Sequence, residues 1–582
     1  MPKTIKQRLS ILLIIFFLIG FNVSFVSGNI FSELNTVKLK VISCESNCFD
    51  SNLSDDPPWE GYTLIAPEYH TDAYLLNNEK EIVHTWQTNQ IQALGTYLLE
   101  DGHLIRTCFP KVNNTKFLGG GRTGRVERWD WDSNLIWEFE YSTDNYCLHH
   151  DIEVLPNGNI LMVAWELHTK NEVIAAGGDP NLILTDELWS DVIIEVEPTG
   201  SSGGNIVWEW HVWDHIIQDY DSSKANYGVI RNHPGLINVN YGGRGIDWNH
   251  INSIDYHPGL DQILISSCCQ SEIWVIDHST TTPESAGHSG GRYGRGGDVL
   301  YRWGNPEAYD HGTIDDRMLY NQHDASWITS GNPGEGNILV FNNGVNRPEG
   351  RYSSVEEIIP PLTNNGHYRY QQDVSYGPDS VEWSYSDGEM YSTILSSAQR
   401  LPNGNTLICD GAKGRIMEVT YDKDLIWDYT NLIGFKNNVF KAIRYSLDYP
   451  GVSNLMHPVI PQKPKGNHIG SINKDYIFST KTTDPNDKMV FYQWDLGNQI
   501  FSEWIGPYSS GLKINYSCHW SEKGIHSLRV RAKNIDGLIS DWSDELTIYI
   551  AQMKQYDQPI LIKLVNILKQ IFNLGMPFSI VS

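Results

Sequence analysis

The chain has 582 residues, of which 40% are hydrophobic and 19% charged, so it can bury a large core and is too apolar to be disordered. Its 12% aromatic residues, 20 tryptophans among them, favour a mostly β globular protein. The formal net charge of −27 argues against nucleic-acid binding, because phosphates would be repelled and the sequence shows no basic patch to offset this.

The first residues have the pattern of a secretory signal peptide. Three basic residues within the first eight precede an apolar run that ends in small residues at Gly28. We therefore expect residues 1–28 to be a signal peptide and residues 29–60 an N-terminal segment of a secreted or cell-surface protein. An uncleaved membrane anchor is the alternative, because the apolar run is long for a signal.

A repeated unit follows, in which a hairpin turn precedes, at some distance, a strand that contains tryptophan. The turns lie at 98–105, 154–161, 258–265, 333–340 and 400–408. The tryptophan strands lie at 82–86, 135–141, 206–212, 299–305, 381–385 and 425–429. Asn-Gly and Asp-Gly between alternating apolar residues favour tight hairpins, since both central positions accept positive φ. The units predict antiparallel blades of about four strands that close into a six-bladed β-propeller over residues 61–455.

The remainder is predicted to form a second, smaller domain. Residues 456–467, with Pro and Lys, have the composition of a linker, and the short alternating strands of residues 468–551 suit an immunoglobulin-like β-sandwich. Residues 552–582 carry apolar residues at helical spacing and are expected to form an amphipathic C-terminal tail, packed on the protein or lying on a membrane surface. The predicted fold class is therefore all-β: a six-bladed β-propeller followed by a small immunoglobulin-like β-sandwich domain. Two partners are left open: a membrane or cell surface, which the chain would contact peripherally, and a second copy of the chain in a homodimer.

Eight cysteines are present. Outside the cell they are free to pair, but the sequence does not give the connectivity. Cys44 and Cys48 are close enough to form a small disulfide loop, which we favour over zinc because no second pair of Cys or His lies beside them.

Histidines recur where the first strand of a predicted blade begins. His150, His250 and His323 hold this place in three blades, so we expect three imidazoles to converge on the central channel. Asp151 and Asp324 directly follow two of them and are placed to orient the rings. Three interpretations stay open: hydrogen-bonded structural histidines, an open zinc site, or a site that transfers a tetrahedral anion.

Several motifs in order resemble the PAPS-independent aryl sulfotransferases, also called arylsulfate sulfotransferases. They are "HHDIEVLPNGNIL", "DWNHINSIDYHPGLDQILISS", "SEIWVIDHSTT", "LYRWGNPEAY", "QHDASWI" and "GNILVFNNG", and the resemblance spans about residues 60 to 430. It implies a six-bladed propeller that moves a sulfuryl group from an aryl sulfate donor to a phenolic acceptor through a sulfohistidine, with ping-pong kinetics. Neither PAPS nor another cofactor is implied, and the chain has no Walker-type phosphate loop.

The resemblance also implies roles for individual residues. The "QHD" motif implies that His323 is the nucleophile. The "HHD" and "HIN" motifs imply that His150, His250 and Asn252 bind sulfuryl oxygens or handle the phenolic proton. Where the family usually has an arginine, "SSCCQSEI" places Cys268, which lacks the guanidinium fork that binds such oxygens.

The presence of Cys268 in place of the family arginine leads to the remaining expectations. We count Cys268, Asp151 and Asp324 with the substrate-binding residues, expect no bound metal, and regard Arg244 as a candidate replacement for the missing arginine. If the replacement abolishes turnover, the chain would be a catalytically impaired propeller that serves as a cell-surface binding or adhesion protein. A metal-dependent hydrolase built on the same histidines is the third interpretation.

Overall fold

The computed structural model describes residues 56–551, apart from residues 113, 243, 244, 435, 456, 486, 498, 499 and 536. The predicted signal peptide, Cys44, Cys48, Arg244 and the C-terminal tail therefore lie outside the described residues. The described part is all-β, as predicted, with only short helices. These are α2 (Lys170–Ala175), α3 (Thr282–Ser285), η1 (Val212–His215), η2 (Ile230–Asn232), η3 (Pro306–Tyr309), η4 (Ile314–Asp316) and η5 (Pro450–Leu455). Within that part, no helix combines the length and apolarity needed to cross a membrane.

Six four-stranded antiparallel sheets lie within the described residues. The first three hold β26 (Ile443–Ser446), β1 (Gly61–Ile65), β2 (Ala73–Leu76) and β3 (Ile82–Trp86); β4 (Gln92–Leu98), β5 (Leu104–Cys108), β6 (Arg125–Trp129) and β7 (Leu135–Glu140); and β8 (Tyr146–Val154), β9 (Ile160–Thr169), β10 (Glu187–Pro198) and β11 (Gly204–His211). The other three hold β14 (Ile251–His257), β15 (Gln262–Ser267), β16 (Glu272–Asp277) and β17 (Tyr301–Trp303); β18 (His323–Trp327), β19 (Ile338–Asn342), β20 (Ser354–Ile358) and β21 (Trp383–Tyr385); and β22 (Ser397–Arg400), β23 (Thr406–Asp410), β24 (Arg415–Val419) and β25 (Leu425–Thr430). A short parallel pair, β12 (Ile216–Ile217) and β13 (Ile237–Asn238), lies outside these sheets.

The predicted units are confirmed at the level of strands. Each predicted tryptophan strand overlaps the last strand of a sheet, namely β3, β7, β11, β17, β21 and β25. Each of the five predicted turns joins the first two strands of a sheet, β4–β5, β8–β9, β14–β15, β18–β19 and β22–β23. The period-2 pattern and the turn residues therefore located the sheets correctly.

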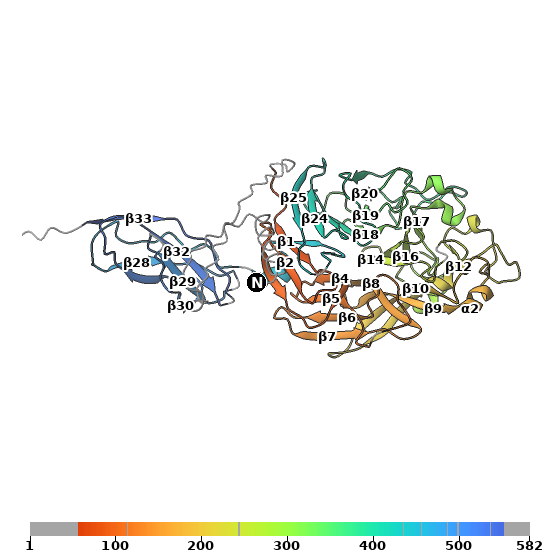
Figure 1. Ribbon diagram of the computed structural model, residues 1–582, viewed down its shortest axis with the longest axis horizontal. Coiled ribbons are helices and arrows are strands. Elements are labelled where there is room, and N and C mark those ends of the chain that lie inside the picture. The colour runs from red at the N-terminus through yellow and green to blue at the C-terminus, as the bar shows by residue number, and fades with distance from the viewer. Residues whose placement is uncertain are drawn as a thin grey trace, which may run out of the picture. The chain divides into compact units, whose positions relative to one another are not determined.

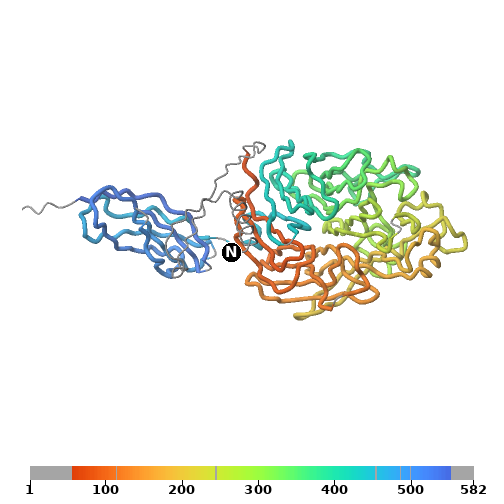
Figure 2. The backbone as a smooth tube through the Cα atoms, viewed as in Figure 1, coloured from red at the N-terminus to blue at the C-terminus, as the bar shows by residue number. Residues whose placement is uncertain are grey.

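The sheet that contains the N-terminal strand is completed by the far end of this part of the chain. β26 pairs antiparallel with β1, from Gly61 opposite Ser446 to Leu64 opposite Ile443. The two segments lie side by side in Figure 2, one red and the other blue-green. β26 lies beyond the last repeat, and the sequence did not predict it as a strand.

Tryptophans in the last strands tie neighbouring sheets together. Their indole Nε1–H groups donate to backbone carbonyl oxygens of the next sheet: Trp137 to Gly203 at 2.9 Å, Trp303 to Pro378 at 2.8 Å, Trp383 to Tyr421 at 2.8 Å and Trp427 to Asn78 at 2.7 Å. The last of these bonds joins the sixth sheet to the first. Buried indoles normally need such a partner, which explains why tryptophan recurs at this place.

The first strands of the six sheets surround one interior cavity of about 180 Å³. Its lining includes one side chain or more from each: Tyr97 of β4, Glu153 of β8, Asp255 of β14, Ser326 of β18, Gln399 of β22 and Ile443 of β26. Figure 1 shows β4, β8, β14 and β18 toward the middle of this body, with β7 and β25 nearer its edge. Residues along the first strands of the six sheets therefore face a shared space.

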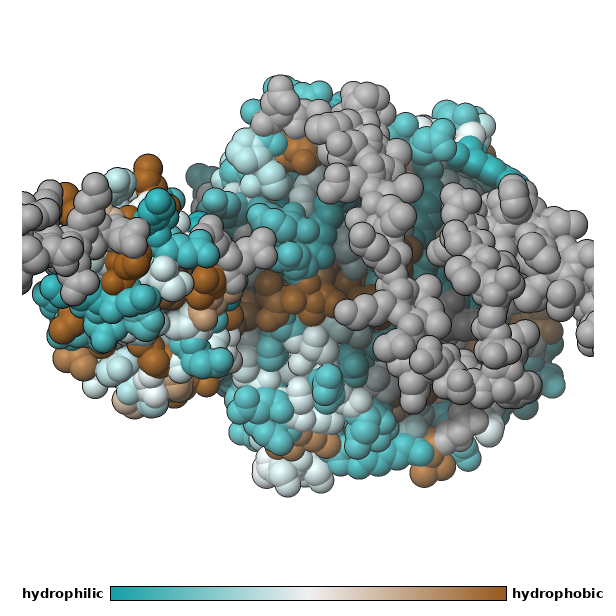
Figure 3. All heavy atoms as spheres, turned by 60° about the vertical axis from the view of Figure 1, so that its left-hand side comes forward, coloured by the Kyte–Doolittle hydropathy of each residue, from teal (hydrophilic) through white to brown (hydrophobic). Residues whose placement is uncertain are grey.

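The C-terminal part has its own core. A five-stranded sheet holds β27 (Ile469–Ser471), β33 (Leu546–Ala551), β32 (Gly524–Asn534), β29 (Val490–Asp495) and β30 (Ile505–Tyr508), and a two-stranded sheet holds β28 (Tyr476–Thr480) and β31 (Ile514–Cys518). Phe478, Tyr492, Trp494 and Val530 are fully buried between them. Apolar side chains also reach the surface of this smaller body (Figure 3), with Ile469, Ile477 and Ile525 among the exposed ones.

Candidate active site

The histidines of the site lie where the first strands are irregular. The pairing of β8, β14 and β18 with the next strand shifts register close to His150, His250 and His323. Such bulges re-aim side chains and are common beside functional sites. His150 and His250 both have a φ of 53°, and so does Asp324. His323 therefore lies one residue earlier in its strand than the predicted alignment placed it.

The structure brings the three predicted imidazoles together. The rings of His150 and His250 lie 4.6 Å apart between centroids, at 77°. His323 Nε2 accepts the Leu395 N–H at 3.2 Å, and Leu395 packs in one cluster with Phe440, whose ring is 6.3 Å from that of His150. Charge on His250 is close enough to lower the pKa of both other rings.

His250 is set up to carry a positive charge. Its Nδ1 lies 2.6 Å from Asp247 Oδ2. Burial acts to lower the pKa of His250, but the charge of Asp247 and this hydrogen bond outweigh burial and raise it above the ordinary 6.5. Since Nδ1–H donates to the carboxylate, the protonated Nε2 is left for a ligand.

His150 is set up to stay neutral. Its Nδ1 lies 2.8 Å from His149 Nδ1, and His149 Nε2 lies 2.8 Å from Asp191 Oδ1, although not aligned for a straight hydrogen bond. A carboxylate oxygen only accepts, so His149 Nε2 carries a proton and His149 Nδ1 accepts from His150. Burial, followed by the charge of His250, places the pKa of His150 well below 6.5. Its Nε2 therefore keeps a free lone pair.

His323 has the tautomer that a nucleophile needs. The amide Nδ2 of Asn343 donates to the carbonyl oxygens of Ser392 and Leu395, so Asn343 Oδ1 is the atom that faces His323 Nδ1 at 2.8 Å. His323 Nδ1 must therefore carry the hydrogen, and the lone pair lies on Nε2, where it accepts the Leu395 N–H and has to release it before it can attack. Burial lowers the pKa of His323 to about 4, so the ring is neutral near pH 7.

The two predicted aspartates contact a lysine, and no bond from either to an imidazole is found among the described residues. Lys441 Nζ lies 3.1 Å from Asp151 Oδ2 and 2.7 Å from Asp324 Oδ1. Asp151 also accepts the hydroxyl of Tyr97, and Asp324 accepts the N–H of Ala398 at 2.9 Å. The expectation that these carboxylates orient the rings is therefore corrected: Asp247 and Asn343 do so for His250 and His323.

The other predicted residues lie close by but offer little charge. Asn252 Nδ2 donates to the Gln322 carbonyl at 2.8 Å. Cys268 is a free, buried thiol that receives a weak hydrogen bond from Asn321 Nδ2 at 3.5 Å. Burial raises the pKa of the Cys268 thiol to about 12, so it is neutral and supplies no substitute for an arginine. The described cysteines are all free, and no disulfide joins any of them.

An aromatic-lined cavity of about 440 Å³ lies directly beside His150. Its walls include Tyr69 and Phe109, whose rings stack 5.9 Å apart, and the guanidinium of Arg122, which lies 5.7 Å above the Phe109 ring. Gly121 separates the cavity from the imidazole, since a Cβ at this position would come within 1.9 Å of His150 Cε1. Only glycine permits this approach.

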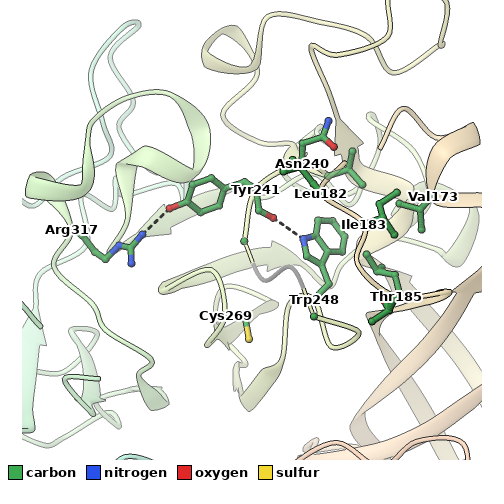
Figure 4. A pocket seen from close by; sticks show the side chains of 13 residues that line it. Val173, Leu182, Ile183, Thr185, Asn240, Tyr241, Trp248, Cys269 and Arg317 are labelled. Atoms are coloured by element: carbon green, nitrogen blue, oxygen red, sulfur yellow. Dashed lines mark hydrogen bonds between the residues drawn. The ribbon is translucent and has the colours of Figure 1, made fainter. Parts of the chain in front are cut away.

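A second cavity of about 440 Å³ lies beside Cys269 (Figure 4). Trp248 Nε1 donates to the Tyr241 carbonyl at 2.8 Å, and Arg317 Nη2 donates to the Tyr241 hydroxyl at 2.8 Å. Val173 and Ile183 supply an apolar wall. The arginine is engaged with the cavity wall, and none of the three imidazoles lines this space.

The residues that set the charge states were missed by the sequence analysis. Asp247 precedes His250 by three residues in "DWNH", and Asn343 stands in "FNNG", so both lay inside motifs that the analysis had noted. His149 was visible as the first histidine of "HHD". Lys441 follows the last repeat and carried no sequence signal.

Comparison of the sequence with models of protein families identifies the family of this chain. The sequence model of the arylsulfotransferase (ASST) family matches residues 97–424, which is more than half of the chain. The protein therefore belongs to the arylsulfotransferase family. No curated protein matches it.

Matches to solved structures cover small parts of the chain. The PKD domain of an M14-like peptidase from Thermoplasmatales archaeon SCGC AB-540-F20 is 34% identical, over 16% of this chain and 97% of that one, with a TM-score of 0.16. The CARDB domain of PF1109 from Pyrococcus furiosus is 9% identical, over 17% of this chain and 97% of that one, with a TM-score of 0.14. TM-scores this low do not support a conclusion about the fold of this chain.

Proposed function

We propose that this protein transfers a sulfuryl group from an aryl sulfate to a phenolic acceptor through a sulfohistidine on His323, without PAPS. The observation that carries the proposal is the division of charge among the imidazoles. His323 is neutral near pH 7 with its lone pair on Nε2, while Asp247 raises the pKa of His250 and so favours its protonated form. A nucleophile and a proton donor of this kind are what a double displacement requires.

In the first half-reaction, His323 Nε2 forms a bond to sulfur as the bond between sulfur and the aryl oxygen breaks. Negative charge develops on the departing oxygen, as in related phosphoryl transfers. His250 gives its Nε2 proton to that oxygen, and Asn343 stabilises the cationic sulfo-imidazole by accepting the Nδ1–H. A phenol leaves, and His250 is then neutral.

In the second half-reaction the acceptor phenol enters the same cavity. His250 takes its proton as the phenolic oxygen attacks sulfur and the bond from sulfur to His323 breaks. Because the single phenolic hydrogen passes to His250, the proposed task of the neutral His150 is to pack against the His250 ring and hold it in position. The products are the new aryl sulfate, neutral His323 and protonated His250, so the cycle closes without a cofactor.

The cavity beside His150 is the proposed binding place for the aryl group. Tyr69 and Phe109 offer faces on which an aromatic ring can stack. Arg122, together with protonated His250, is the proposed source of positive charge in place of the arginine that Cys268 replaces. Arg122 Nη1 donates to the Asn114 carbonyl at 2.6 Å, which anchors the guanidinium at the rim of the cavity.

The proposal also covers the arrangement of the chain into domains. We propose that the six sheets are the blades of a closed β-propeller over residues 61–455, supported by the β26–β1 pairing and the indole bonds between sheets. Residues 456–467 would be the linker, residues 468–551 an immunoglobulin-like module, and residues 552–582 the tail that contacts a surface. Export through residues 1–28 and formation of a homodimer complete the proposal.

Turnover of 4-nitrophenyl sulfate, with and without phenol, tests the function. Nitrophenolate release that depends on phenol and survives a chelator is the expected result. Release without acceptor would indicate hydrolysis, and loss with chelator would indicate the metal-dependent hydrolase. Absence of release under all conditions would favour the catalytically impaired cell-surface binding protein, which the neutral thiol of Cys268 makes the second candidate.

A further inference from the structure

We propose that His215, His288 and Asp298 form a binding site for a divalent metal ion of the zinc class, separate from the candidate active site. His215 ends η1, and the other two residues lie in the loop between α3 and β17. The Nδ1 atoms of His215 and His288 lie 3.0 Å and 2.7 Å from the same oxygen, Asp298 Oδ1. Two imidazoles and a carboxylate thus converge on one point.

The hydrogen bonds of His215 favour a cation at this point. Its Nε2 lies 2.8 Å from the Ser285 carbonyl oxygen, which only accepts, so Nε2 carries the hydrogen. A neutral His215 then directs the Nδ1 lone pair at the Asp298 carboxylate, and two lone pairs repel. A metal ion shared by both atoms removes this repulsion.

The donor set selects the class of ion. Imidazole nitrogens suit zinc and its neighbours in the first transition row, whereas calcium and magnesium prefer oxygen ligands alone. The three donor atoms lie within 4.8 Å of one another. Ligands at about 2.1 Å from a tetrahedral zinc are about 3.4 Å apart, so the two nitrogen–oxygen distances of 3.0 and 2.7 Å would lengthen by about 0.4 and 0.7 Å on binding. The His288 side chain is 60% exposed, which leaves solvent access for a water at the fourth position.

Such an ion would add to the bonds that hold a glycine-rich loop, among them those from Tyr293 N–H to Asp277 at 3.1 Å and from Trp210 Nε1 to the Gly297 carbonyl at 2.7 Å. Residues 287–297 contain several glycines at positive φ, whose backbone freedom is costly to restrict. Gly297 packs directly on His215, since a Cβ there would lie 2.6 Å from Nε2. One metal joining η1 to both ends of this loop would stabilise the folded protein by mass action.

His168 and His211 also contact one carboxylate oxygen, Glu166 Oε2, at 3.6 and 3.0 Å, but these three donor atoms do not all lie within metal-binding reach of one another. His278 contacts two carboxylates through opposite nitrogens, Nδ1 to Asp261 and Nε2 to Glu195, as an ion pair does. His519 pairs with Asp475 alone and is 58% exposed. Within the residues that the structure describes, one group of three side chains brings its donor atoms within metal-binding reach.

Metal content and affinity test the site on the untagged full chain. The protein is stripped with EDTA, reloaded with ZnCl2, dialysed and analysed for zinc, and the Kd is measured by competition with a chromophoric chelator. We expect about one zinc per chain, and His288→Ala should weaken binding by at least about 100-fold, since even the loss of an outer-shell partner costs 10- to 100-fold. His519→Ala, which removes an equally exposed histidine, should bind zinc like the wild type.

A His250→Ala variant separates this site from the imidazole cluster of the active site. It should retain the zinc if the proposal holds. Loss of zinc in His250→Ala with retention in His288→Ala would overturn the site and move the metal to the active site. Failure of the wild type to bind zinc below about 100 µM would also overturn it, whatever the transferase assay shows. Circular dichroism of each variant checks that the fold is kept.

Discussion

At the scale of single residues, three buried imidazoles differ because their neighbours differ. Asp247 gives His250 a negative partner, whereas His323 faces the neutral amide of Asn343 and His150 faces another imidazole. In the proposed function the imidazole is therefore a proton donor at His250, just before β14, and a nucleophile at His323. This division, and not the mere presence of histidines, is what makes the site suited to transfer.

The pH dependence of kcat/KM follows from these pKa shifts. His323 must be neutral to attack, so activity should fall as pH drops through its pKa of about 4. His250 must be protonated to assist departure, so activity should fall as pH rises through its pKa, which lies above 6.5. A bell-shaped profile measured with 4-nitrophenyl sulfate is expected. A profile that is flat from pH 4 to 9 would contradict the assignments.

Asp247→Asn should narrow the pH profile of kcat/KM by moving its alkaline limb to lower pH. Without the carboxylate, burial lowers the pKa of His250, so the ring is neutral at pH 7.5 and its proton is missing. We expect kcat/KM at pH 7.5 to fall by about 100-fold and the alkaline limb to move below pH 6.5. Asp221→Asn, which alters a carboxylate that accepts from Ser223, serves as the control and should leave the profile unchanged.

Neighbouring glycines provide a matched test of the cavity wall. A methyl group at Gly121 would come within 1.9 Å of His150 and meets a φ of +81°, while one at Gly120 meets no atom within 4 Å. Gly121→Ala should displace His150 and lower kcat by at least about tenfold, and Gly120→Ala should behave like the wild type. Equal rates for the two variants would show that the wall next to His150 is irrelevant to turnover.

At the scale of elements, charged residues at or next to the first strands of three sheets contact one another. Lys441, just before β26, forms ion pairs with Asp151 of β8 and Asp324 of β18 beside the central cavity. Its side chain is 12% exposed, so the three charges depend on one another rather than on water. The segment that pairs with β1 thus also balances charge between the sheets that carry His150 and His323.

Lys441→Met should destabilise the protein by about 3–5 kcal/mol, because it leaves two buried carboxylates without a counter-charge. Burial already raises the pKa of Asp151, so the carboxyl takes up a proton more readily than in the unfolded chain. The loss should therefore be largest at neutral pH and shrink as pH falls toward 4.

Urea unfolding at several pH values measures this change. Lys111→Met is the control, because Lys111 is 53% exposed in its pair with Glu138 and should contribute less than about 1 kcal/mol. A Lys441→Met loss as small as that of the control would contradict the dependence between the three charges.

The sequence predicted the elements better than it predicted the site's chemistry. Turn residues and tryptophan strands are local signals, so six closing strands and five hairpins were located. β26, Lys441 and the Asn343 contact depend on residues that meet only in the folded chain, from 20 to several hundred positions apart. The choice of tautomer at His323 depends in turn on what the other end of Asn343 binds, which no local pattern contains.

At the scale of the whole molecule, the first sheet is completed by the two ends of the 61–455 segment. β26 supplies the first strand of the sheet in which β1 lies second, and Trp427 bonds to Asn78 across the same junction. Pairing the ends leaves the edge of β1 covered, and we expect it to join the sheets into one cooperative unit.

Truncation tests this closure. A chain that ends at His457 keeps β26 and should retain transfer within about twofold of the full chain, because the C-terminal module takes no part in the chemistry. A chain that ends at Phe440 lacks β26 and Lys441 and should lose its cooperative unfolding transition. Equal stability of the two truncated chains, followed by circular dichroism on heating, would refute closure by β26.

The most direct measurement of the central claim is mass spectrometry of the protein incubated with an aryl sulfate in the absence of acceptor. The proposal predicts a gain of about 80 Da on the peptide that contains His323, stable to alkali and lost when phenol is added. A His323→Asn variant should show no such gain. Phenol release with the label on another residue, or with no label during turnover, would contradict the proposed sulfohistidine.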